Sequence, residues 1–196
     1  MRGQAVEQTV AGHPRCIGRA VVGGISVRPV TGSDARVIAS MWDRCALATR
    51  IARFHAPVRN IPASYLTAVF ADPSASVVAV CQHCGAVVAL ASLLPSASQD
   101  CAELGVLVED AWQRAGIGRR LVAHLIATAH ARGITALTAS VLADHAKVAD
   151  LLRQIPGEFS LAFDGPVLKV QIRLVSPVVL AAGQKPWAWF CRSASW

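Results

Sequence analysis

The stretch "CAELGVLVEDAWQRAGIGRRLVAHLIATAHARG", residues 101–133, joins an apolar run to an amphipathic one through a turn with two glycines and three arginines. The first run predicts a β-strand over 102–108, because it is short and rich in Val and Leu. After the turn, Ile117, Leu121 and Leu125 recur at fourfold spacing, which predicts a helix. The sequence therefore places a glycine-containing turn at a strand-to-helix junction.

Such a junction is suited to binding a phosphate. Backbone N–H groups in the first turn of a helix lack partners within the helix, and glycines let a phosphate approach them closely. Two common phosphate motifs do not fit. No lysine follows Gly118, as a Walker loop requires, and Leu121 stands where a dinucleotide fingerprint has its third glycine. The turn then either holds the phosphate of a different ligand or only starts the helix.

On both sides of the junction, the chain alternates strand-like and helix-like segments. Strands are predicted over 25–30, 76–81, 86–94, 102–108, 135–142, 158–163 and 168–175. Helices are predicted over 34–47 with Ser33 as its cap, 49–55, 63–71, the segment that follows the glycines, and 144–155. Because strands come both before and after the central helices, the pattern predicts an α+β fold on one mixed sheet.

Composition excludes several classes of protein. The chain has 196 residues, of which 54% are apolar and 16% charged, and a net charge of +7. The basic residues are scattered and aromatic residues are sparse, which argues against a nucleic-acid partner. The most apolar stretch, 76–94, is interrupted by Gln82, His83 and Gly85, so it predicts two buried strands and no membrane helix. With no visible secretory signal, we expect reduced cysteines and a cytoplasmic protein.

The two ends of the chain differ from its body. Residues 1–24 lack periodicity and predict a flexible arm. The tail, residues 176–196, carries three of the five tryptophans. It leaves three arrangements open: packing on the domain, sealing a homodimer, or an exposed end.

At the junction, "VLVEDAWQRAGIGRRL" (106–121) resembles the acyl-CoA signature of the GNAT superfamily of N-acyltransferases, whose core is [QR]-x-x-G-x-[GA]. The order of elements over 25–175 also resembles that fold. A weaker resemblance, in "VRPV" (27–30) and "TRIARFH" (49–55), is to bacterial GNAT domains related to protein-lysine acetyltransferases. The resemblance implies a GNAT domain at 25–175, with a mixed, mostly antiparallel sheet of six to seven strands flanked by helices.

The same resemblance implies acetyl-CoA as co-substrate and an amine as acceptor, with direct transfer in a ternary complex. The acyl-CoA pyrophosphate and pantetheine are expected on two neighbouring segments. The residues implied in cofactor binding are Val106, Leu107, Val108, Gln113, Arg114, Ala115, Gly116, Ile117, Gly118 and Arg119. Those implied at the acceptor site are Arg53, Phe54, His55 and Tyr65. The alternative function is a non-catalytic module that binds or senses acyl-CoA.

Two residues are candidates for proton transfer. Glu103 is the only acid on the central strand and lies where relatives have a proposed base. An exposed strand face is its alternative explanation, and a bulge expected in this strand would change the face that Glu103 occupies. The position that matches the tyrosine acid of many family members is Leu152. His145 stands at a family asparagine and is the second catalytic candidate, with a surface histidine as its alternative.

The pair of cysteines in "CQHC" (81–84) is a weak metal signal. Zinc prefers four ligands, and no second cysteine pair follows. We therefore expect no metal, and predict a hairpin turn with buried thiols at this place.

Overall fold

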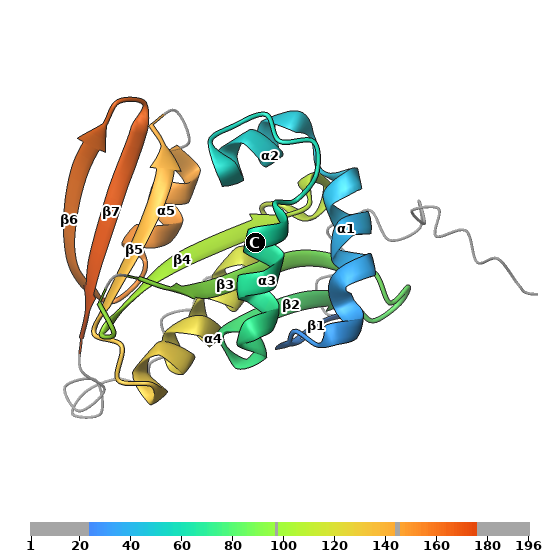
Figure 1. Cartoon of the computed structure of the whole chain (residues 1–196), viewed down its shortest axis with the longest axis horizontal. Helices are drawn as coiled ribbons and strands as arrows, with labels where there is room; N and C mark the ends of the chain where they lie inside the picture. The colour runs from blue at the N-terminus through green and yellow to red at the C-terminus, as the bar shows by residue number, and fades with distance from the viewer. Residues whose placement is uncertain (1–23, 97, 144–145, 176–196) are drawn as a thin grey trace, which may run out of the picture.

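The computed structural model describes residues 24–96, 98–143 and 146–175, and its seven strands form one sheet in the order β1-β2-β3-β4-β5-β7-β6 (Figure 1). The strands are β1 (Ile25–Pro29), β2 (Ser76–Cys81), β3 (Val87–Pro95), β4 (Cys101–Val108), β5 (Ala136–Leu142), β6 (Gly157–Asp164) and β7 (Val167–Leu174). Neighbouring strands run antiparallel except β4 and β5, which are parallel. The predicted α+β fold on a mixed, mostly antiparallel sheet is confirmed. The predicted arm, tail and His145 lie outside the described residues.

Helices cover both faces of the sheet, with α1 and α3 on one face and α4 on the other (Figure 1). The helices are α1 (Ala35–Arg44), α2 (Leu47–Phe54), α3 (Ala63–Ala71), α4 (Ile117–Ala131) and α5 (Ala146–Arg153). Short 3-10 turns lie at Gly32–Asp34, Pro73–Ala75 and Asp110–Trp112. Among the helices that the structure describes, none is long and apolar enough to cross a membrane.

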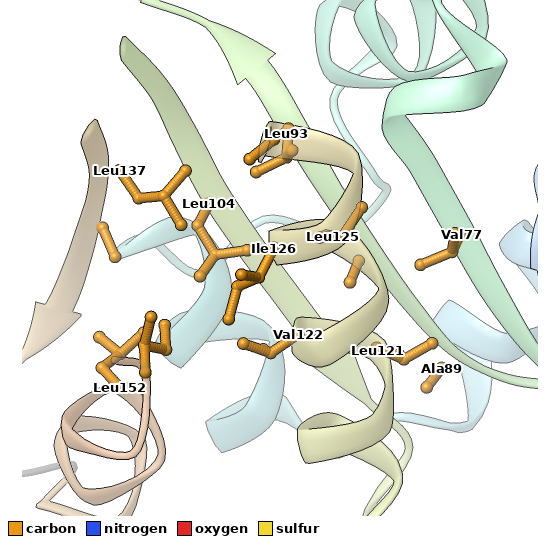
Figure 2. Close-up of a cluster of buried hydrophobic side chains, with 14 of the residues drawn as sticks. Val77, Ala89, Leu93, Leu104, Leu121, Val122, Leu125, Ile126, Leu137 and Leu152 are labelled. Atoms are coloured by element: carbon orange, nitrogen blue, oxygen red, sulfur yellow. The ribbon is translucent and has the colours of Figure 1, made fainter. Parts of the chain in front are cut away.

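The fourfold apolar spacing after the glycines buries one side of α4 against the sheet. Figure 2 shows Leu121, Val122, Leu125 and Ile126 of α4 directed at side chains of the neighbouring strands. Those partners include Val77, Ala89, Leu93, Leu104 and Leu137. Leu152 of α5 is also buried in this cluster, so the residue that matches the family's tyrosine is a core side chain.

The prediction that Ser33 caps the first helix is wrong. The Thr31 amide and hydroxyl both donate to the Asp34 carboxylate, at 2.7 and 2.9 Å. Arg28 of β1 also donates to both oxygens of Asp34, at 2.6 and 2.7 Å. This hydrogen-bonded ion pair lowers the pKa of Asp34 to about 2. The carboxylate, and not the Ser33 hydroxyl, therefore anchors the start of α1 to the sheet.

The feature that positions the site is the separation of β4 from β5. The two strands pair only from Cys101–Glu103 with Ala136–Thr138, and then diverge (Figure 1). Beyond Glu103, β4 keeps its partner β3, and no other strand of the described residues pairs with its second side. Half of β4 is thus an internal strand of the sheet, and the other half borders an opening.

The bulge expected in β4 lies elsewhere. The pairing of β3 with β4 shows no register shift, whereas the pairing of β2 with β3 shifts between Ala79 and Val80. Alternation along β4 is therefore regular. Val106 packs in the core beneath α4, and Leu107 packs in the core beneath α1 and α3. Glu103 shares the face of Leu107, because residues four apart on a strand lie on one side.

Candidate active site

The loop between β4 and α4 exposes a row of backbone amides. Arg114 and Gly116 both have left-handed backbones, with φ of +62° and +77°. The first helical hydrogen bond of α4 is donated by the Arg120 amide to the Gly116 carbonyl, at 3.1 Å. Among the described residues, no backbone carbonyl accepts from the amides between Arg114 and Gly118. These N–H groups and the positive end of α4 form a site for an anion.

Gly118 keeps the start of α4 close to the open half of β4. A Cβ at this position would lie 3.5 Å from Leu151, 3.7 Å from Val108 and 3.9 Å from Val106. The amide row therefore adjoins an apolar surface built from β4 and α5. Ile117 is buried in the core, so only its backbone is available to a ligand. The adjacency of these two surfaces was implied by the family resemblance and by no local pattern.

The backbone of β4 presents alternate residues to the opening. The amide of Glu109 donates to the Val88 carbonyl of β3 at 3.0 Å, and amide directions alternate along an antiparallel strand. The amides of Val106 and Val108 therefore point away from β3, toward the side where β5 has separated. The amide of Leu107 points toward β3. The Leu107 side chain is buried on the face of the sheet that α1 and α3 cover.

A polar network fixes this turn to the start of α2. The Asp110 carboxylate accepts from the Ala46 amide and from the Thr49 hydroxyl, both at 2.7 Å. The side-chain amide of Gln113 donates to Thr49 at 3.2 Å and to the Val108 carbonyl at 3.1 Å. Gln113, predicted to bind the cofactor, thus joins α2 to the end of β4. No local pattern predicts this network, since the bonds from Asp110 and Gln113 to Ala46 and Thr49 join residues more than sixty positions apart.

The four residues predicted at the acceptor site come from the end of α2 and from α3. The Phe54 and Tyr65 rings meet edge to face with centroids 5.3 Å apart, and the Arg53 guanidinium lies 4.9 and 4.7 Å from them. His55 follows in a left-handed conformation. Its Nε2 atom is buried and has no hydrogen-bond partner among the described residues. The structure therefore brings Arg53, Phe54 and Tyr65 together.

Three residues that sequence analysis missed complete this surface. The Trp42 ring packs against Phe54 at 5.5 Å, and the Ser92 hydroxyl hydrogen-bonds the Tyr65 hydroxyl at 3.1 Å. Gly105 lies beneath Arg53, and a Cβ there would overlap the guanidinium. Buried aromatic and serine side chains have no sequence pattern that separates them from ordinary core residues.

Glu103 is exposed and is the last residue of β4 to pair with β5. It lies two residues from Gly105 on the same face of the strand, which is the face that carries Arg53. The carboxylate is thus accessible at the point where the two strands separate. This exposure agrees both with a proton acceptor and with the alternative explanation, an exposed strand face.

The "CQHC" segment forms the turn between β2 and β3. Cys81 is buried and Cys84 is exposed, so the predicted hairpin turn is confirmed and only one of the two thiols is buried. Within the described part of the chain, no three His, Cys, Asp or Glu side chains are grouped to hold a metal ion.

Comparisons with known proteins bear on this arrangement. The family model described as acetyltransferase (GNAT) family matches residues 39–154. No curated protein sequence matches the chain. The GNAT domain of S. lividans PAT is similar, with 24% identity, a TM-score of 0.67, and coverage of 76% of this chain and 89% of that one.

Two further structures share the fold. One is a GNAT superfamily phosphinothricin acetyltransferase from Sinorhizobium meliloti in complex with AcCoA, with 19% identity, a TM-score of 0.58, and coverage of 77% and 89%. The other is the ribosomal-protein-S18-alanine N-acetyltransferase from Escherichia coli, with 18% identity, a TM-score of 0.55, and coverage of 76% and 92%. The family model spans more than half of the sequence, and the chain belongs to the acetyltransferase (GNAT) family of enzymes.

Proposed function

We propose that this protein transfers an acetyl group from acetyl-CoA directly to a primary amine, in a ternary complex of enzyme and both substrates. One observation carries the proposal: β4 separates from β5 after Glu103, and the part of β4 that borders the opening lies beside the amide row at the start of α4. An anion site next to an open strand edge suits a ligand with a pyrophosphate and a peptide-like arm. A structure related by fold contains AcCoA, which supports this donor.

Different residues of the loop and of β4 bind different parts of acetyl-CoA. The backbone amides from Arg114 to Gly118 hold the pyrophosphate, with Arg119 on the same first turn and the Gln113 side chain supporting the loop. The open-edge amides of Val106 and Val108 pair with the arm. One of them also polarises the thioester carbonyl, because an amide aimed at a developing oxyanion stabilises it.

Glu103 accepts the proton that the attacking amine must lose. The amine nitrogen forms a bond to the acetyl carbonyl carbon, the carbon–sulfur bond breaks, and CoA leaves with the electron pair. Leu152 cannot protonate the sulfur, since it is an aliphatic core residue. We assign that step to His145 or to departure of the bare thiolate, which is a tolerable leaving group.

The test is incubation of the full chain with acetyl-CoA, isotopically labelled in its acetyl group, and a mixture of primary amines. We expect free CoA thiol to appear together with a labelled N-acetyl product in mass spectrometry. Calorimetry with CoA runs in parallel. Binding of CoA without thiol release in any mixture would favour the alternative, a non-catalytic acyl-CoA-binding module.

A further inference from the structure

The Arg53 guanidinium occupies an unusual position on the face of β4. It stacks on Phe54 at 4.9 Å and Tyr65 at 4.7 Å, and it rests on Gly105, where any side chain would overlap it. The absence of a side chain at position 105 thus lets the cation approach the strand closely. Glu103 follows roughly 7 Å away along the same face.

This cation has no anionic partner among the described residues. Arg28, Arg44 and Arg132 each pair with a carboxylate. Arg53 forms no such pair, and its Nε atom is buried without a hydrogen-bond partner in the described part of the chain. A buried donor without an acceptor is unfavourable, and an arginine fork binds a carboxylate with two parallel hydrogen bonds. The site therefore has the chemistry of an anion receptor.

The surroundings favour an anionic group that is part of the acceptor. The neutral Ser92 and Tyr65 hydroxyls bond each other at 3.1 Å, so they do not neutralise Arg53. Glu103 is exposed on the same face and attracts an ammonium group. One cation and one anion at this spacing match a molecule that carries both an amine and a carboxylate.

We propose that Arg53 binds the carboxylate of the acceptor, and that the acceptor is a small primary amine that carries a carboxylate, such as an amino acid. This inference rests on the proposed function. The carboxylate is not consumed: the amine nitrogen gains the acetyl group, CoA leaves with the electron pair of the broken carbon–sulfur bond, and the charge on the acceptor carboxylate is unchanged. Arg53 then sets the choice of acceptor, and Glu103 takes the proton.

The first test compares L-alanine, L-methionine, L-phenylalanine and L-glutamate with their α-carboxamides, by kcat/KM for CoA release. The wild type should prefer an acid over its amide by about 10- to 100-fold, the range for a hydrogen bond between charged groups. Arg53→Met should abolish the preference, because kcat/KM for the acids should fall by that factor more than kcat/KM for the amides. Arg59→Met, which removes an exposed arginine on the following loop, should keep the preference.

A second test does not need turnover. The Nε–H signal of Arg53 in a ¹⁵N spectrum is assigned by its loss in Arg53→Met. With CoA present, N-acetyl-L-methionine should shift this signal, and N-acetyl-L-methioninamide should not.

Three outcomes overturn the inference: equal turnover of acids and amides by the wild type, a preference that survives in Arg53→Met, or an Arg53 signal that neither probe shifts. The first two leave the proposed acetyl transfer intact. Failure of acetyl transfer itself appears separately, as CoA binding without thiol release from any amine.

Discussion

Two arginines on α2, one turn apart, show how the same residue type serves two regions of the molecule. Arg50 lies over the Trp42 ring at 5.3 Å, and its guanidinium donates to three backbone carbonyls. Those acceptors are Cys45 at 2.9 Å, Asp43 at 3.0 Å and Arg59 at 3.4 Å. Arg53 also lies over aromatic rings, but no hydrogen bond or ion pair joins it to any described residue.

The difference lies in the partners and not in the sequence pattern. Arg50 ties the corner between α1 and α2 to the loop that follows α2, so its bonds stabilise the scaffold. Arg53 lies on the face of β4 that also carries Glu103. There, the carboxylate of a substrate can supply the hydrogen-bond acceptor that Arg53 lacks. We therefore expect substitutions in the first region to change the free energy of unfolding, and substitutions in the second to change turnover.

The largest effect is expected at Glu103. Glu103→Gln keeps the shape of the side chain and removes the proton acceptor, so kcat/KM should fall by roughly 10²- to 10⁴-fold near neutral pH. The loss should shrink at high pH, where more of the amine is already deprotonated. The melting temperature should stay near that of the wild type, because the side chain is exposed. Wild-type rates from about pH 6 to 9 would assign the proton to water or to another group.

Arg44 belongs to the scaffold region and should behave in the opposite way. Its side chain donates to Glu109 at 2.8 and 3.0 Å, and the Glu109 side chain is only 10% exposed. Arg44→Met leaves that carboxylate buried without its cation, and should lower the free energy of unfolding in urea by about 3 kcal/mol. The double variant Arg44→Met/Glu109→Leu should recover most of the loss. A double variant as unstable as the single one would place the effect in packing instead.

A third arginine, Arg28, forms an ion pair with Asp34, so its contribution to stability should depend on pH. Because the folded-state pKa of Asp34 is about 2, below its unfolded value, the ion pair stabilises the protein above about pH 4. That stability is lost as the pH falls toward 2. Asp34→Asn should cost about 2 kcal/mol at pH 7, less than the full linkage value since the Arg28 side chain is 41% exposed. Urea unfolding of both proteins at pH 7 and pH 2.5 should show that the difference between their free energies of unfolding becomes smaller in acid. A difference that stays constant would contradict the assigned dependence of stability on the ionisation of Asp34.

The smallest effect is expected for Arg50→Met. Loss of its hydrogen bonds to carbonyls should cost about 1 to 2 kcal/mol, because the carbonyls are partly solvated after the change. Carbonyls do not titrate in this range, so the cost should be equal at pH 2.5 and pH 7, unlike that of Asp34→Asn. The acid-over-amide preference should be retained. Loss of that preference in Arg50→Met would remove the distinction between the two regions.

The parts of the fold that sequence predicted are those with local signals. The spacing of Ile117, Leu121 and Leu125 placed α4, and the glycines placed its start. The register shift between β2 and β3 was missed, because strands buried on both faces have no alternation from which to read parity. The pairing of Thr31 with Asp34 at the start of α1 was missed because Ser33 stands closer to the helical pattern, although Thr followed three residues later by Asp is a capping signal.

The site was predicted unevenly for a related reason. The glycine loop was recognised from its local pattern as a place for a phosphate, whereas its acyl-CoA ligand and the residues Arg53, Phe54 and Tyr65 came from the family resemblance. Trp42, Ser92 and the network of Asp110 with Thr49 depend on contacts between distant segments, and a single sequence does not encode them as patterns. The difference between Arg50 and Arg53 is of this kind, since only the tertiary structure shows which arginine has acceptors.

The central claim, that the start of α4 holds the acyl-CoA pyrophosphate, is tested most directly at Gly116. Asn and Asp both tolerate the left-handed conformation that Gly116 adopts, at φ +77°, and a Cβ there meets nothing within 4 Å. Gly116→Asn and Gly116→Asp thus differ mainly by one negative charge. Calorimetric titration with CoA at low salt should give a Kd at least about tenfold higher for Gly116→Asp than for Gly116→Asn. The ratio of the two Kd values should become smaller at high salt, because salt screens the added charge. Equal affinities in the two variants would contradict the pyrophosphate site.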